Sequence, residues 1–264
     1  MRTEFPYSTA EQLATIQQMI TNYLRLPFAG DTLPGSLLEA IIGKVHNAEV
    51  LKTYDFADVV KRGEIGWQVK STKSKTPVTW MRAKIPEKQE LIAASQQDTI
   101  GKQNLGNAII AYCNAHVAES LNHYGLEQIG YARLVLFPKG HIMYFERLLL
   151  SAEQPVLFQP TDYHSTDYHW DWSPPKRTKG KEQLPAFVGR LHETGDKHFA
   201  WHGLGENQLH FSGESSWWLP EEDGHRIDFS APTSAQRVDF ETIADWLAQL
   251  PLIEAEASSD SPIR

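Results

Sequence analysis

Apolar residues at helical spacing predict the first elements of the chain. Residues 8–28 open with a serine and a threonine and then place apolar side chains every three or four positions, as an amphipathic helix does. The stretch 36–48 repeats this period, and Glu39 lies off its apolar stripe. A longer helical pattern covers 97–125 in spite of glycines at 101 and 106. We therefore expect three helices in the first 125 residues.

Alternating and apolar stretches predict strands between and after these helices. Residues 49–60 and 64–72 read as two strands joined by a tight turn, and 129–138 and 140–150 read as a hairpin around Pro138–Gly140. Residues 76–97 have no regular pattern and are expected to be irregular. The order helix, helix, strand, strand, helix, strand, strand favours an α/β core with a mixed sheet.

The amino-acid composition of the chain changes beyond residue 151. This part is rich in Trp, His, Gly and Pro, which is typical of short strands and long loops. Residues 240–250 have a helical pattern, and we expect this helix to pack back on the protein. The polar tail 251–264 is expected to be mobile.

Composition narrows the class of protein. The chain has 264 residues, 41% of them hydrophobic, which is ample for a packed core, and Cys113 is its single cysteine. No apolar run approaches the roughly 20 residues that span a bilayer, and the first residues lack the apolar centre of a secretory signal. We expect a cytoplasmic protein that does not bind a membrane.

The charge pattern bears on nucleic-acid binding. A net charge of -8 argues against non-specific coating of nucleic acid, which depends on many phosphate contacts. Two basic clusters stand out locally. Residues 61–88 hold eight Lys or Arg against two Glu, and 174–181 hold four Lys or Arg with no acid. Such clusters gain meaning only where they border a site.

One strand pair carries the candidate chemistry. Because strand faces alternate, Gln68 and Lys70 share one face. A three-residue loop at 62–64 would pair Lys61 with Ile65 and place Asp58 directly opposite Gln68. A two-residue turn would instead place Asp55 opposite Lys70, so the choice between the two aspartates stays open.

These groups suit a hard cation beside a phosphate. Magnesium (Mg²⁺) prefers oxygen ligands, which the Asp58 carboxylate, the Gln68 amide and the Val69 backbone carbonyl offer. Lys70 would then orient or deprotonate the attacking water, or neutralise charge on the phosphoryl oxygens.

This arrangement resembles the PD-(D/E)XK nuclease superfamily. Its motif is an Asp at the end of one strand and Glu-x-Lys, or sometimes Gln-x-Lys, on the next, which Asp58, Gln68 and Lys70 match. Glu39 matches the acid that the preceding helix often supplies to the metal site, and the helix that follows the strands also fits. The resemblance covers residues 34–137. Two departures are Gln68 in place of the commoner Glu, which weakens the expected metal affinity, and the absence of a proline before Asp58.

The resemblance implies a type II restriction endonuclease. Such a protein would be a homodimer that cuts both strands of a palindromic site in double-stranded DNA with Mg²⁺. It also implies a catalytic core at 1–150, with a mixed central sheet flanked by helices, and a DNA-recognition region at 151–250 packed on that core. The expected DNA contacts are Lys73, Lys75, Arg82, Lys176, Arg177, Lys179, Lys181, Asn207 and Gln208.

Three alternatives compete with the nuclease motif. His198, His202 and His210 with Asn207 suggest a metal cluster or a His-Asn-His nuclease, although glycines at 203 and 205 break the helix that such a pair needs. A glycoside hydrolase would use Glu206 and Glu214 beside the aromatic residues Trp201, Trp217 and Trp218. The third alternative is a non-catalytic protein whose aromatic C-terminal half binds a ligand.

Overall fold

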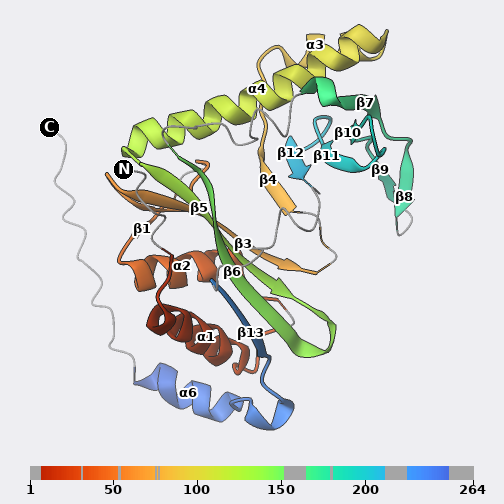
Figure 1. Cartoon of the computed structure of the whole chain (residues 1–264). Coiled ribbons are helices and arrows are strands. Elements are labelled where there is room, and N and C mark those ends of the chain that lie inside the picture. The colour runs from red at the N-terminus through yellow and green to blue at the C-terminus, as the bar shows by residue number, and fades with distance from the viewer. Residues whose placement is uncertain are drawn as a thin grey trace, which may run out of the picture.

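The protein contains two β-sheets and a long helix, α4 (Thr99–Tyr124), that packs against both of them (Figure 1). The computed structural model describes residues 7–30, 32–52, 55–74, 76, 78–151, 165–178, 181–211 and 225–249. The general α/β class expected from the sequence is confirmed.

The two N-terminal helices form where the apolar period predicts them. Helix α1 (Ala10–Leu24) starts at Thr9, whose hydroxyl accepts a hydrogen bond from the backbone of Gln12, while the Gln12 side chain accepts one from Thr9. This reciprocal cap satisfies donors that the first helical turn leaves unpaired. Helix α2 (Gly35–His46) ends at Asn47, which adopts the left-handed conformation.

The larger sheet is mixed, as the sequence predicts. Within the described residues its order is β1 (Glu49–Val50), β2 (Val59–Lys61), β3 (Ile65–Lys73), β5 (Gln128–Leu136), β6 (His141–Ser151) and β13 (Arg226–Ser230). Strands β3 and β5 run parallel, and the other neighbours run antiparallel. A parallel pair needs a long crossover, which here includes helix α4 (Thr99–Tyr124).

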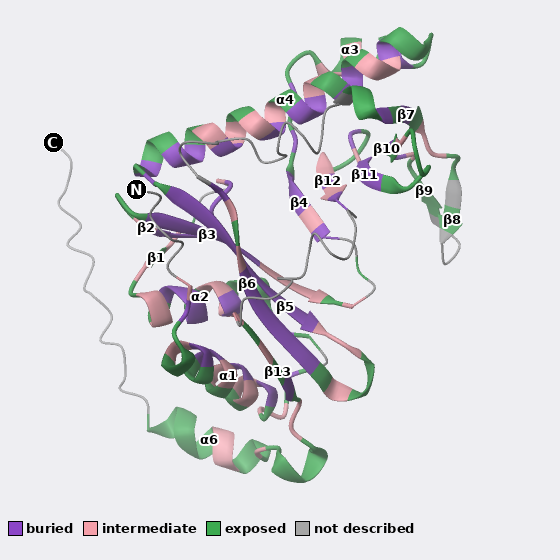
Figure 2. Cartoon of the chain, viewed as in Figure 1, coloured by how far each residue is buried: buried purple, intermediate pink, exposed green. Residues whose placement is uncertain are grey.

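The larger sheet is buried on both faces. Trp67 and Val69 of β3 belong to the apolar cluster formed with α1 and α2, whereas Tyr131 of β5 belongs to the cluster formed with α4 and the smaller sheet. Figure 2 shows the buried central strands β3, β5 and β6 between these layers. Gln68 and Lys70 therefore lie on the α4 side.

The smaller sheet packs against α4. Its strands lie in the order β4 (Val78–Arg82), β12 (Gln208–Phe211), β11 (Lys197–Trp201), β10 (Phe187–Leu191) and β7 (Tyr168–Trp172). A Cβ atom on Gly106 of α4 would come within 2.5 Å of the Trp170 indole, so this helical glycine permits close packing. Strands β8 (Lys176–Thr178) and β9 (Lys181–Gln183) form a separate pair.

Each half of the chain contributes a strand to the other half's sheet. Strand β4 pairs with β12, and β13 pairs with β6. Residues 76–97, predicted to be irregular, hold β4 and helix α3 (Lys88–Ser95), so that prediction was wrong. The partner of β4 lies far away in the sequence, which no local pattern reveals.

Two other sequence predictions need correction. The single strand expected at 49–60 is two strands, β1 and β2, because the chain loops out after Val50 and returns at Asp58, whose carbonyl accepts the Leu51 amide. Helix α6 (Phe240–Ala248) forms where predicted but has no buried residue, so it does not pack back on the protein as expected. The tail 251–264 lies outside the described residues.

The remaining short turns are 3-10 helices, at Pro138–Gly140 between β5 and β6, at Ser165–Asp167 and at Ser234–Gln236. The first confirms the predicted hairpin.

Candidate active site

The β2–β3 hairpin has the three-residue loop. Lys61 pairs with Ile65, and Val59 pairs with Trp67. The Asp58 amide donates to the Trp67 carbonyl at 2.9 Å, which continues the pairing by one residue. Asp58 therefore lies opposite Gln68, and the register with Asp55 opposite Lys70 is wrong.

One carboxylate oxygen of Asp58 binds both a backbone amide and a side chain of β3. Oδ2 of Asp58 accepts the Val69 backbone amide at 2.7 Å and the Lys70 ammonium at 3.2 Å. Both charged side chains remain about a quarter exposed, at 24% for Asp58 and 22% for Lys70. The ion pair is thus partly shielded from water but open to a ligand.

Gln68 is the buried member of the cluster. It is 2% exposed, and its Nε2 donates to the Trp80 carbonyl of β4 at 2.9 Å. Its Oε1 is also buried and has no hydrogen-bond partner among the described residues. A buried acceptor left unpaired costs about 1–3 kcal/mol, so this oxygen is a notable departure from a well-satisfied interior.

Glu39 approaches the same cluster from α2. Burial raises the pKa of its carboxyl, the negative charge of Asp58 raises that pKa further, and the positive charge of Lys70 lowers it. Glu39 therefore senses both charges of the Asp58–Lys70 pair. It is not among the described residues that line the cavity beside that pair.

Asp55 has a different environment from Asp58. The Tyr124 hydroxyl at the end of α4 donates to its carboxylate. Asp55 lines the same cavity as Asp58, so it stays close to the motif although it is not paired across the hairpin.

A cavity of about 250 Å³ lies over the polar face of β3. Asp55 and Asp58 supply its acidic side. Its basic residues are Lys70 on β3, Arg82 at the end of β4 and Lys84 just beyond β4. Tyr112 and His116 of α4 also line the cavity, and their stacked rings lie 5.9 Å apart.

Searches against models of protein families, curated proteins and solved structures found no match. A function for this chain must therefore be inferred from the chemistry of this site.

Lys84, Tyr112 and His116 were not assigned to the site from the sequence. Lys84 lies in the stretch that was expected to be irregular, and Tyr112 and His116 are four residues apart on α4. Their spacing places them on one helix face, which is a signal that the sequence contained.

The predicted DNA contacts do not converge on this cavity. Arg82 lines it, but Lys73 lies at the end of β3 and borders another cavity. Asn207 accepts a hydrogen bond from Lys88, and Gln208 donates to Glu206. The remaining candidates are placed on the β8–β9 pair or outside the described residues: Lys176, Arg177 and Lys181, and Lys75 and Lys179.

The histidine cluster proposed from sequence does not assemble. His198 is buried against the Tyr168 hydroxyl at 3.0 Å, while the His202 and His210 rings lie 4.6 Å apart on the smaller sheet. Burial lowers the pKa of both His202 and His210. Within the described ranges, no three His, Cys, Asp or Glu side chains form a group able to hold a metal.

The glycoside hydrolase arrangement loses Trp201 from its aromatic surface. Trp201 is fully buried and donates its indole N–H to the Ala83 carbonyl, so it cannot stack on a sugar. Glu206 is exposed, and the remaining members, Glu214, Trp217 and Trp218, lie outside the described residues.

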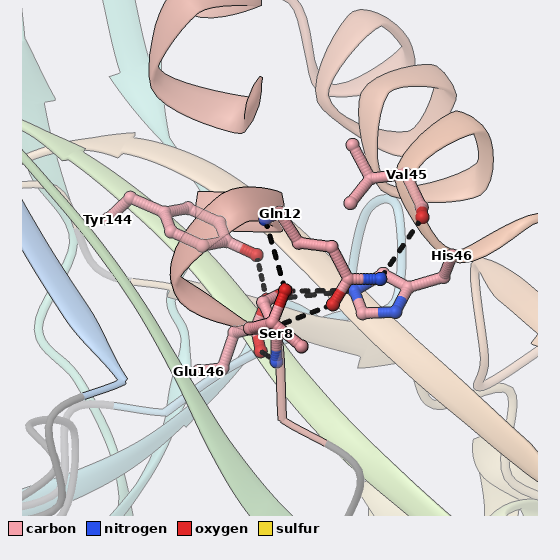
Figure 3. A network of polar contacts seen from close by, with 7 residues as sticks. Ser8, Gln12, Val45, His46, Tyr144 and Glu146 are labelled. Carbon is pink, nitrogen blue, oxygen red and sulfur yellow. Dashed lines mark hydrogen bonds and ion pairs between the residues drawn. The ribbon is translucent and has the colours of Figure 1, made fainter. Parts of the chain in front are cut away.

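A second polar cluster lies on the opposite face of the larger sheet (Figure 3). Glu146 of β6 is fully buried and accepts hydrogen bonds from the Ser8 hydroxyl and the Tyr144 hydroxyl, each at 2.6 Å. The Ser8 amide donates to the other oxygen of Glu146 at 2.9 Å. His46 contacts Ser8 Oγ through Nε2 at 3.0 Å.

No helix in the part of the chain that the structure describes combines the length and the apolar character needed to cross a membrane.

Proposed function

We propose that this protein is a metal-dependent endonuclease of the PD-(D/E)XK type that hydrolyses phosphodiester bonds in double-stranded DNA. The observation that carries the proposal is the joint placement of three groups on one cavity. These are the Asp58 carboxylate, the Lys70 ammonium bonded to it, and the buried Gln68 amide with its unpartnered oxygen.

The oxygen chemistry of the site fits Mg²⁺. The Asp58 carboxylate and Gln68 Oε1 would hold the ion together with the Val69 carbonyl, and Glu39 would support the site from α2. Mg²⁺ is usually bound through few protein oxygens and keeps several waters, so a small set of this kind is adequate. The bound ion would supply Lewis-acid activation of the phosphate and a more acidic water.

Lys70 has the position of a charge-stabilising residue. Its ammonium is held 3.2 Å from Asp58, and Lys70 lines the cavity in which the phosphate would bind. An oriented ammonium stabilises the charge that develops on the phosphoryl oxygens. The Val69 amide fixes the Asp58 carboxylate and so keeps the ion pair in one geometry.

The basic side of the cavity suits the DNA backbone. Arg82 and Lys84 are exposed on and just beyond β4, next to Lys70. We further propose that recognition of a specific, palindromic sequence involves the smaller sheet and the β8–β9 pair. A homodimer would place two such sites on the two antiparallel strands.

Cleavage of mixed-sequence duplex DNA tests the proposal. The protein is incubated with the DNA in Mg²⁺ or in EDTA, and the ends are mapped on both strands. We expect cleavage only with Mg²⁺, loss of cleavage in Lys70→Ala, and full cleavage in the control Lys44→Ala on the exposed end of α2. Cleavage that persists in Lys70→Ala would refute the assignment of this site.

A further inference from the structure

A second cavity lies where β3 and β5 end, and it is separate from the cavity of the proposed nuclease site. Its volume is about 510 Å³, within the range of small-molecule sites. It is bordered by the end of α1 at Leu24, by the ends of β3 and β5, and by the segment that follows β13. It shares no described lining residue with the cavity beside Asp58.

Backbone hydrogen bonds join the walls of this cavity. The Ser74 amide donates to the Leu136 carbonyl at 3.0 Å, which ties the end of β3 to that of β5. The Ala231 amide donates to the Gly140 carbonyl at 2.7 Å, and the Val238 amide donates to the Arg25 carbonyl at 2.9 Å. Segments far apart in sequence are thus held together, and the cavity is preformed.

The interior of the cavity is apolar. Leu24 and Ile142 are buried in the apolar cluster of the α1 side, and Leu136 packs against that cluster. Phe137 and Pro232 add further apolar surface to the lining. An apolar or aromatic body would fit against these side chains and lose contact with water.

The titratable side chains of the described lining are all basic. They are Lys73, Lys139, His141 and Arg237. His141 has the Asp228 carboxylate 3.1 Å away, whereas Lys139 and Arg237 have no ion-pair partner within the described residues. Such a concentration of cations runs against the composition of the chain, which has 33 acidic residues and 25 Lys or Arg.

Lys139 is an exposed lining residue in the turn between β5 and β6. Its backbone lies in the left-handed region at φ 65°, followed by Gly140 at φ 79°. The Phe137 amide closes this turn by donating to the His141 carbonyl at 2.8 Å, which fixes the backbone of Lys139 beside the cavity.

We propose that this cavity binds a small organic anion, with its apolar or aromatic body against Leu24 and Ile142 and its negative group between Lys139 and Arg237. The apolar lining residues match the body of such a ligand, and the basic lining residues match its negative group. Because the walls are preformed, little order has to be imposed on binding. The proposal does not rest on the nuclease function.

Anilinonaphthalene sulfonate, which combines an aromatic body with one negative group, is a direct probe. We expect saturable binding, followed by its fluorescence, to one site on the full chain. The variant Lys139→Gln/Arg237→Gln removes the cations, and Ala231→Trp fills the cavity. Each is expected to weaken binding roughly tenfold. Leu247→Gln on exposed α6 is the control for adsorption to surface apolar residues and should leave binding unchanged.

Competition then identifies the source of the ligand. Displacement by adenosine monophosphate points to nucleotides, and displacement by dodecanoate points to fatty acids. Inorganic phosphate should displace the probe weakly, because it lacks the apolar body. Absence of saturable binding, or equal binding by the wild type and both cavity variants, would overturn the proposal. Unchanged circular dichroism of each variant shows that it has folded.

Discussion

Two polar clusters on opposite faces of the same sheet differ in how completely their hydrogen bonds are satisfied. On the α1 side, both carboxylate oxygens of Glu146 accept hydrogen bonds, from Ser8 and Tyr144. On the α4 side, Asp58 and Lys70 form a partly exposed pair, and a buried oxygen of Gln68 has no hydrogen-bond partner in the part of the chain that the structure describes. The first cluster is closed, whereas the second borders a cavity.

The closed cluster contains a serine, a histidine and an acid, but it is not a catalytic triad. In a triad the histidine lies between the acid and the serine and takes the serine proton. Here Ser8 donates its only hydroxyl proton to Glu146, so the contact with His46 requires the His46 Nε2 to be the donor. His46 therefore cannot act as a base towards Ser8. The cluster fastens the start of α1 and the end of α2 to β6.

The contrast separates a structural use of polar residues from a functional one. A buried network with every donor and acceptor paired fixes one arrangement of the chain. A buried oxygen without a hydrogen-bond partner lowers the stability of the protein, and this cost is explained if the oxygen binds a ligand. The following predictions test this distinction, beginning with the largest expected effect.

Removing the Lys70 ammonium should abolish most activity without unfolding the protein. We expect Lys70→Ala to lower the cleavage rate by about a hundredfold to a thousandfold, as loss of one charge-stabilising donor does. Because the pair is partly exposed, its contribution to stability is small, at about 1 kcal/mol or less. Single-turnover cleavage measures the rate, and urea unfolding measures the stability. A large loss of stability would show that Lys70 serves to hold the fold together.

Removing the Glu146 carboxylate should have the opposite signature. Glu146→Ala leaves the Ser8 and Tyr144 donors buried without an acceptor and opens a cavity in the core. We expect the free energy of unfolding to fall by about 3 kcal/mol or more. At a temperature where the variant is still folded, its cleavage rate should match that of the wild type. A folded Glu146→Ala variant without activity would show that this cluster is part of the site.

The pH dependence of stability should report the same cluster. Burial alone would raise the pKa of Glu146, but the hydrogen bonds from His46, Ser8 and Tyr144 outweigh it and lower that pKa below 4.5. An acid with a lowered folded-state pKa stabilises the protein above its unfolded-state pKa, and this stabilisation is lost as the pH falls through the folded-state value.

The stability advantage of wild type over Glu146→Gln should therefore be constant near neutral pH and shrink below about pH 4.5. Urea unfolding of both proteins at several pH values measures this difference. The other carboxylates are the same in both proteins, so their contribution to the pH dependence of stability cancels. A difference that grew on acidification would contradict the assigned direction of the pKa shift.

The geometry of the hairpin was predictable because it is local. A three-residue loop fixes the pairing of Lys61 with Ile65, and the alternation of a strand then places Gln68 and Lys70 on one face. The position of Trp80 above Gln68 was not predictable, because β4 is fixed by its pairing with β12, far along the chain. The sequence patterns therefore did not reveal that residues of β4 line the cavity.

The closed cluster was also missed, although one signal was present. Tyr144 and Glu146 lie two apart in a strand that is otherwise strongly apolar, so a charge is placed on an inward face. A charge there requires buried partners, but nothing local identifies Ser8, just before α1, and His46, at the end of α2.

Replacing Gln68 should have the smallest effect on stability and gives the sharpest test of the comparison. Gln68→Met keeps the length of the side chain, removes the unpaired oxygen and loses the hydrogen bond to the Trp80 carbonyl. These two changes oppose each other, so we expect the free energy of unfolding to change by no more than about 1 kcal/mol. The Mg²⁺ concentration needed for half-maximal cleavage should nevertheless rise, because the variant lacks an oxygen ligand. A metal titration of the cleavage rate alongside urea unfolding measures both. If stability fell strongly while the metal requirement stayed the same, Gln68 would be a structural residue like Glu146, and the two faces of the sheet would no longer differ in kind.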